Sequence, residues 1–259
     1  MADFNAPPYE GAGLYQVTQF HDGPRKGERC SAAAGYLHPV MDRPNLTVLT
    51  RVLARRGIVT DGRATGIEAG RGSRRLRLNA GHEVILSAGS FGSPQLLLLS
   101  GIGPEEELAA HGIPVVHALP GVGRNLQDHL DHVLSWRSKR TDVIGLNPAG
   151  LWRYLRAGLD WRRTGEGLFA SPMAEAVAFL RSSPGVDRPD LQIHFVIGIV
   201  DNHMRKIHLA NGYSAHVCAL KPHSRGQVGL NGADPALPPR IATRSRAAAR
   251  VRRARPSLG

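Results

Sequence analysis

Hydrophobic and polar residues alternate along several short stretches of the chain, and this period of two predicts strands. In the clearest case, Leu191, Ile193 and Phe195 alternate with polar residues. The same pattern and the turn residues around it predict further strands over 13–20, 46–50, 51–54, 64–68, 76–78, 213–220 and 227–230. A continuous apolar run over 83–87 leads into Ala88 and Gly89, which predicts a buried strand ending at a glycine.

Helices are predicted where capping residues, proline and glycine bracket an apolar pattern, over 32–37, 95–99, 104–111 and from 147 onward. Ser31 caps the first of these helices. The third has proline at its start, three glutamates in its first turn and Gly112 after its end.

In the helix that Asn147 caps, Leu151, Leu155 and Leu159 are four residues apart and share one face. Two tryptophans of this stretch, Trp152 and Trp161, are expected to pack inside the domain, because an indole on a helix is usually part of a core.

Composition narrows the class of protein. The 259 residues carry 33 Lys and Arg against 21 Asp and Glu, and 42% of them are hydrophobic, as in a globular chain of one or two domains. No apolar run approaches the ~20 residues of a membrane helix, and the first ten residues do not resemble a signal peptide. We therefore expect a cytoplasmic protein without an integral membrane segment, with Cys30 and Cys218 as reduced thiols.

Half of the net charge of +12 lies in the segment 241–259, which contains six arginines and no acid. This segment has no aromatic residue and no nucleic-acid motif, so a disordered basic tail is favoured over a nucleic-acid partner. Its abrupt change of composition after Arg240 favours a third interpretation over both of these, a shifted reading frame.

Three other motifs are weak. The glycine pattern over 165–170 follows a predicted helix rather than a strand, which disfavours a dinucleotide site. The twelve histidines, among them His129 with His132 and His203 with His208, lack the spacing of a metal site, so no metal is predicted. Ser90 and Ser93 do not form the elbow of a serine hydrolase.

The predicted strand, glycine and helix over 83–103 form a stronger candidate. A helix N-terminus offers unpaired N–H groups and partial positive charge, and a preceding glycine lets an anionic cofactor approach the backbone. From the residues alone, a phosphate or flavin contact and a merely structural packing of small residues are equally compatible with this segment.

The sequence Glu83-Val-Ile-Leu-Ser-Ala-Gly-Ser-Phe-Gly-Ser-Pro-Gln-Leu-Leu-Leu-Leu-Ser-Gly-Ile-Gly103 resembles the second signature of the glucose-methanol-choline (GMC) oxidoreductases. The segments 11–19, 29–37, 43–50 and 119–129 support the likeness in the family's order, and 189–195 with 221–230 resemble the choline- and alcohol-dehydrogenase-like branch. The resemblance covers residues 3–241.

The resemblance implies an α/β fold in which 1–131 forms part of an FAD-binding domain and 132–240 part of a sheet-plus-helices (α+β) substrate-binding domain, followed by the tail 241–259. It implies FAD as cofactor and hydride transfer from choline or another primary alcohol to the flavin, giving an aldehyde. The cofactor contacts that it carries over are Ala88, Gly89 and Ser93, together with Ala54 after the strand that follows Arg43-Pro44. Neither the alcohol nor the electron acceptor is identified.

The family's N-terminal FAD fingerprint and its C-terminal catalytic histidine, with a His or Asn partner, have no counterpart in these residues. We therefore expect an internal fragment that is inactive by itself, and no catalytic residue is assigned; His129, His194 and His216 are not promoted to the role. Two alternatives stay open at this point, a non-catalytic remnant or partner protein and a basic nucleic-acid-binding protein.

Overall fold

The computed structural model describes residues 3–140, 145, 148–200, 208, 210–243, and all structural statements below concern these residues. They form two compact units, each assembled from separate stretches of the chain. The first unit takes in 3–47 and 129–221, and the second takes in 48–128 and 222–243. The chain passes from one unit to the other after residues 47, 128 and 221. Compactness alone does not assign flavin or substrate to either unit, so that assignment stays a prediction.

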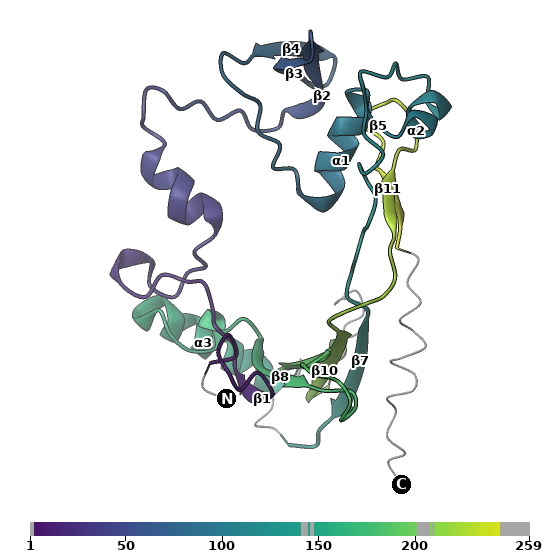
Figure 1. Ribbon diagram of the computed structural model, residues 1–259. Coiled ribbons are helices and arrows are strands. Elements are labelled where there is room, and N and C mark those ends of the chain that lie inside the picture. The colour runs from purple at the N-terminus through teal and green to yellow at the C-terminus, as the bar shows by residue number, and fades with distance from the viewer. Residues whose placement is uncertain (1–2, 141–144, 146–147, 201–207, 209, 244–259) are drawn as a thin grey trace. The chain divides into compact units, whose positions relative to one another are not determined.

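The first unit is built on a five-stranded antiparallel sheet (Figure 1). Its order is β1–β8–β9–β10–β7, with bounds Gly11–Leu14, Ala174–Leu180, Leu191–Val196, Gly212–Ala219 and Asp131–Arg137. The strand predictions over 191–195 and 213–220 are confirmed by β9 and β10. The strand predicted over 13–20 is mostly wrong, because β1 ends at Leu14 and overlaps the predicted range only at residues 13 and 14. Strands β7 and β8 were not predicted.

Helix α3, Pro148–Thr164, belongs to the same unit, and it confirms the helix predicted to start near Pro148. Its predicted cap, Asn147, lies outside the described residues. The indole N–H of Trp161 donates to the Gly27 carbonyl at 3.3 Å, so this tryptophan does pack within the unit. The same expectation for Trp152 is wrong, because 69% of that residue is exposed.

A short helical segment follows β1 in the sequence. Ala33–Leu37 forms a π-helical turn, and the Ser31 hydroxyl accepts a hydrogen bond from the Ala34 N–H at 3.2 Å. The predicted cap is therefore confirmed. A 3-10 turn over His38–Val40, which includes Pro39, then continues the helical stretch beyond the predicted end at residue 37.

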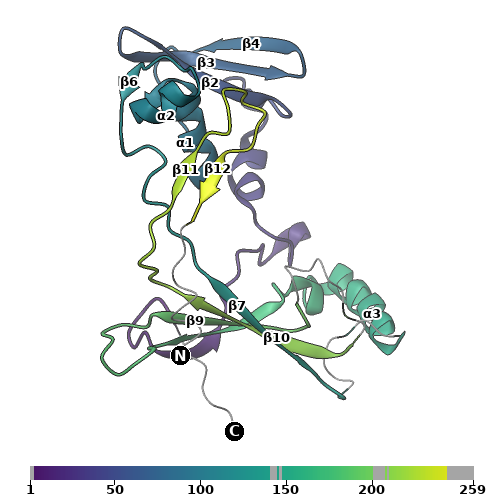
Figure 2. The ribbon, with the colours of Figure 1, turned by 90° about the vertical axis from the view of Figure 1, so that its right-hand side faces the viewer.

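The second unit contains a three-stranded antiparallel sheet, β2 (Leu53–Thr60), β3 (Arg63–Arg71) and β4 (Arg74–Asn79), which Figure 2 shows side by side. Four further strands of this unit form two separate pairs. These are the parallel pair β5 (Ile102–Gly103) with β6 (His117–Ala118), and the antiparallel pair β11 (Gln227–Gly229) with β12 (Arg240–Ala242).

Two helices, α1 (Gly89–Leu99) and α2 (Glu105–Ala110), supply the core of this unit. The buried cluster consists of Leu98, Leu99, Leu108, Val122 and Leu230. The bounds of α2 confirm its prediction, with the acidic residues in the first turn and Gly112 in the left-handed region at φ 65° after its end. The predicted mixture of helices and sheets, an α/β class, is confirmed.

Three local predictions in the second unit are wrong. Helix α1 begins at Gly89 rather than after Pro94, which lies inside it. Residues 46–50 and 83–87 are not strands, and Ile85 is 75% exposed rather than buried. A strand is stabilised by the neighbours that pair with its backbone, and none of the described residues pairs with either segment. An apolar run therefore does not become a strand by itself.

The predicted tail boundary at residue 241 falls inside β12, where Ile241 pairs with Val228. Glu107 of α2 fixes this strand pair. Its carboxylate accepts hydrogen bonds from the Leu230 N–H at 2.8 Å and from the Arg240 guanidinium at 2.8 and 3.0 Å. Burial raises the pKa of Glu107, but these N–H donors outweigh it and leave the pKa below its usual value.

We expect Glu107→Gln to destabilise the second unit by about 1–2 kcal/mol at pH 7, because the charge that Arg240 contacts is lost. A folded-state pKa below the unfolded one adds stability above the unfolded pKa, and this contribution disappears as the pH falls through the folded value. The difference between the variant and the parent should therefore shrink on acidification in urea titrations. The exposed Glu106→Gln should show neither effect, and an equal loss in both variants would contradict the prediction.

Candidate functional site

Three of the four predicted cofactor contacts lie within six residues, in the first turn of α1 and the residue before it. We call residues 88–93 the Gly89 loop. Ala88 is the N-terminal capping residue, and its N–H donates to the Ser93 hydroxyl at 3.0 Å. Gly89 follows at φ 76°, in the left-handed region that favours glycine. A Cβ placed on Gly89 would meet no other atom within 4 Å. The first turn of α1 is therefore open at Gly89, and an anionic group can approach the backbone there.

The fourth predicted contact, Ala54, lies in β2 and is paired with Ala69 of β3. A register shift follows immediately, between Ala54 and Arg56. Strand β2 also contacts α1, where the Gly57 N–H donates to the Ser100 hydroxyl at 2.7 Å. This contact is at the opposite end of α1 from the Gly89 loop. Ala54 therefore lies in the same unit as the loop, but no hydrogen bond among the described residues connects β2 to the loop.

A polar cluster lies on the sheet of the first unit and was not predicted. The Tyr15 hydroxyl is hydrogen bonded to His194 Nδ1, and it accepts a hydrogen bond from Gln192 Nε2 at 3.1 Å. His194 is directly paired with His216 of the neighbouring strand. His216 Nδ1 lies 2.6 Å from a carboxylate oxygen of Asp131. Cross-strand pairing thus brings together two histidines that are 22 residues apart in the sequence.

Burial dominates the electrostatics of this cluster. It raises the pKa of Tyr15 and lowers the pKa of His194, which favours the neutral form of each side chain. Burial together with the nearby Asp131 raises the pKa of Cys218 to about 11, so this thiol is protonated at neutral pH. The ring Nε2 of His216 is buried without a hydrogen-bond partner among the described atoms. The cluster therefore brings Tyr15 and His194, whose neutral forms are favoured, next to His216 and the Asp131 carboxylate.

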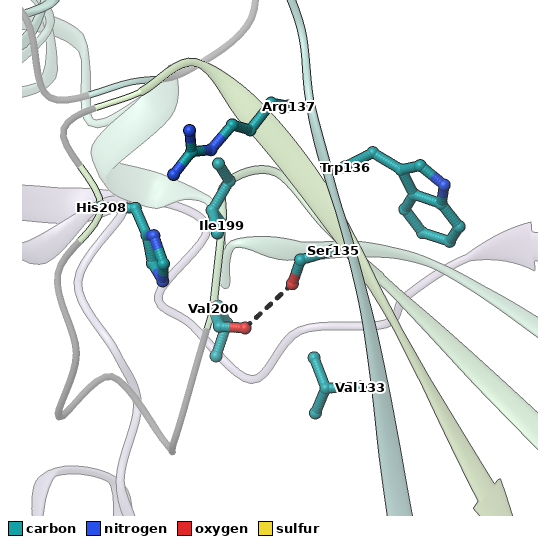
Figure 3. Close-up of a pocket in the computed structure, with 7 residues that line it drawn as sticks. All are labelled: Val133, Ser135, Trp136, Arg137, Ile199, Val200 and His208. Atoms are coloured by element: carbon teal, nitrogen blue, oxygen red, sulfur yellow. Dashed lines mark hydrogen bonds between the residues drawn. The ribbon is translucent and has the colours of Figure 1, made fainter.

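A cavity of about 290 Å³ lies beside the same sheet (Figure 3). The Ser135 hydroxyl, which donates to the Val200 carbonyl at 3.1 Å, and the side chains of Arg137 and His208 give it polar walls. Trp136 and two aliphatic residues complete the lining that the structure describes. Its size is at the lower end of that of small-molecule sites.

The weaker motifs of the sequence are also placed. The glycine pattern over 165–170 follows α3, which confirms that it does not follow a strand. Within the described part of the chain, no group of three or more His, Cys, Asp and Glu side chains is arranged to hold a metal ion. His203 lies outside the described residues. Cys30 and Cys218 are both free thiols, as predicted.

A comparison with known protein families decides the assignment. The family model of the GMC oxidoreductases matches residues 2–131, half of the chain. This chain belongs to the GMC oxidoreductase family. The matched residues include the whole Gly89 loop and strands β2 to β4.

Curated GMC relatives agree with the predicted branch. The chain is 42% identical over 241 residues to an alcohol dehydrogenase (acceptor) of Pseudomonas putida, covering 92% of this chain and 43% of the relative. It is 40% identical over 245 residues to an oxygen-dependent choline dehydrogenase of Sinorhizobium medicae, covering 92% of this chain and 42% of the relative. The chain thus spans less than half the length of these two relatives.

Solved structures show the same GMC fold. A formate oxidase of Aspergillus oryzae superposes with a TM-score of 0.73 at 26% identity, covering 85% of this chain and 42% of the other. Pyridoxine 4-oxidase of Mesorbium loti superposes with a TM-score of 0.67 at 25% identity, covering 89% and 43% of the two chains. The formate oxidase structure was determined to examine modification of FAD in that enzyme.

Proposed function

We propose that this GMC chain contributes a flavin-contacting loop and part of the substrate side of an FAD-dependent enzyme that oxidises choline or another primary alcohol to an aldehyde. Membership of the family supports the proposal, together with its 40–42% identity to choline and alcohol dehydrogenases. The observation that carries it is the open first turn of α1 at Gly89, which fits an anionic cofactor group. When bound, FAD would supply the acceptor for the hydride of the alcohol.

The four predicted contacts divide into two roles in this proposal. The backbone of Ala88 and Gly89 leaves room for the cofactor, and the Ser93 hydroxyl holds the turn by accepting the Ala88 N–H. Ala54 would contribute a backbone contact from β2. Residues 1–131 would then form the FAD-binding part and 132–240 the substrate-binding part.

Two variants of Gly89 test the loop. Asp and Asn both tolerate the left-handed region better than most residues and have nearly the same size, but only Asp adds a negative charge. We expect Gly89→Asp to lose at least about tenfold in FAD affinity by repulsion of the pyrophosphate, although an acidic residue stabilises a helix N-terminus. Gly89→Asn should retain most of the affinity.

The measurement is the absorbance spectrum of the full 259-residue chain after incubation with FAD and removal of free cofactor, with affinities from flavin fluorescence. Gly81→Asn, in another open position, is the matched control. Equal FAD affinity in the Asp and Asn variants would remove the loop from the proposed site. A parent spectrum without flavin bands would contradict FAD binding by these residues.

We also propose that these 259 residues do not oxidise alcohols by themselves, because none of them is assigned as the base that accepts the hydroxyl proton. With FAD retained, anaerobic addition of choline or a primary alcohol should leave the flavin absorbance unchanged. Bleaching that depends on the alcohol would show that a base is present, and His194 and His216 would then be the first residues to substitute.

A further inference from the structure

Helix α3 has one packed face and one exposed apolar face. On the packed face, Trp161 donates to Gly27, and Tyr154 is half-buried. On the other, Leu151, Leu155 and Leu159 are exposed by 61, 56 and 58%, and Trp152 by 69%. We call Leu151, Trp152, Leu155 and Leu159 the leucine–tryptophan face.

Helix geometry makes these four residues one continuous strip. At 100° per residue, they span an arc of about 100° on the helix surface. Phe169, which is 51% exposed, adjoins the helix, since a Cβ placed on Gly158 would lie 3.5 Å from its ring. Single exposed leucines are ordinary on protein surfaces, but a contiguous apolar strip marks an interaction site.

The charges around the strip indicate what it meets. The helix carries four arginines and one acid, a net charge of 4 − 1 = +3. Asp160 is 3.9 Å from Arg156, so its charge is already matched. Arg162 and Arg163 are exposed in the last turn, and Arg162 projects within the arc of the leucines. An apolar strip with a tryptophan and bordering arginines is the pattern of a helix that lies in the interface of an anionic membrane.

We infer that α3 binds the surface of membranes that contain anionic lipids, with the leucine–tryptophan face inserted at the level of the headgroups. The apolar side chains would enter the boundary of the acyl chains while the arginines contact lipid phosphates. Binding in the plane of the surface agrees with the composition of the helix. Among the residues that the structure describes, no helix is long and apolar enough to cross a bilayer. The inference does not depend on flavin binding.

The test is flotation of the full chain with vesicles of phosphatidylcholine alone and of phosphatidylcholine with 30% phosphatidylglycerol. We expect binding to the anionic vesicles that is at least about tenfold weaker for Leu151→Gln/Leu155→Gln/Leu159→Gln. The matched control removes three exposed apolar residues of the second unit, Leu49→Gln/Ile85→Gln/Leu119→Gln, and should bind like the parent. Both variants conserve charge, and circular dichroism checks their helix content.

The charge component is tested separately. Arg162→Gln/Arg163→Gln should weaken binding to the anionic vesicles by about tenfold or more and leave binding to neutral vesicles unchanged. Binding of the parent should also fall with added salt. Quenching of tryptophan fluorescence by brominated lipid should disappear in Trp152→Phe and persist in Trp136→Phe.

Three results would overturn the inference. Undiminished vesicle binding by the triple leucine variant would assign the binding to other residues, such as the arginine-rich segment 241–259. Absence of quenching through Trp152 would show that the face is not inserted. If the parent chain dimerises and does not bind vesicles, and the triple leucine variant is monomeric, then a second copy of the chain occupies the leucine–tryptophan face.

Discussion

Leu108→Ala is expected to lower the free energy of unfolding of the second unit by about 2–5 kcal/mol. Leu108 is fully buried and belongs to the cluster that joins α1, α2 and the residue after β11. Removing its side chain leaves a cavity against leucines whose own helices fix their positions, so the site cannot collapse to fill it.

The measurement for Leu108→Ala is hydrogen exchange of peptides over 96–100 and 227–231. Tryptophan fluorescence does not report this unit, because Trp136, Trp152 and Trp161 all lie in the other one. Leu119→Ala, at a residue 42% exposed, should change exchange by less than about 0.5 kcal/mol. A similar small change for Leu108 would mean that the cluster is not the core of the unit.

Gly123→Ala is expected to destabilise the same unit by about 3 kcal/mol or more. Gly123 has φ 73°, and an added Cβ would lie 2.0 Å from the Val228 carbonyl oxygen, far inside contact distance. Its own carbonyl accepts a hydrogen bond from the Val228 N–H at 2.7 Å, so the two segments cannot separate without losing this bond.

Gly121→Ala is the matched control for Gly123, since a Cβ at Gly121 meets no other atom within 4 Å. The two variants add the same methyl group two residues apart. Protection of the amides over 226–230 should fall only in Gly123→Ala. Equal protection in both variants would contradict the close approach of residue 123 to β11.

Prediction from the sequence succeeded where the signal is local. The three glutamates and Gly112 define α2 by interactions within a few residues. The Ser31 hydroxyl caps the turn over Ala33–Leu37 by accepting the N–H of Ala34, three residues later. The alternation of apolar and polar residues over 191–195 identified β9, although burial along this strand does not alternate and Phe195 is exposed. The family signature identified the Gly89 loop as the candidate site, although its cofactor contacts stay predictions.

Prediction failed where the outcome depends on distant partners. The run over 83–87 is apolar enough for a buried strand, but no described strand pairs with it. Trp152 was expected in a core because its residue type favours one, whereas the side of α3 that packs against the rest of its unit is set by tertiary contacts. The pairing of His194 with His216 could be found only from the register of β9 with β10, which the sequence pattern does not contain.

The interleaving of the two units governs how the chain can fold during synthesis. Strand β1 pairs with β8, with Gly11 opposite Phe179, a separation of 179 − 11 = 168 residues. The ribosome must therefore deliver the entire segment 48–128 of the other unit before β1 meets its partner. Until then, the N-terminal residues of the growing chain lack the strand that β1 pairs with, which makes them a target for chaperones and proteases. For the same reason, neither unit can be transplanted into another protein as one uninterrupted gene segment.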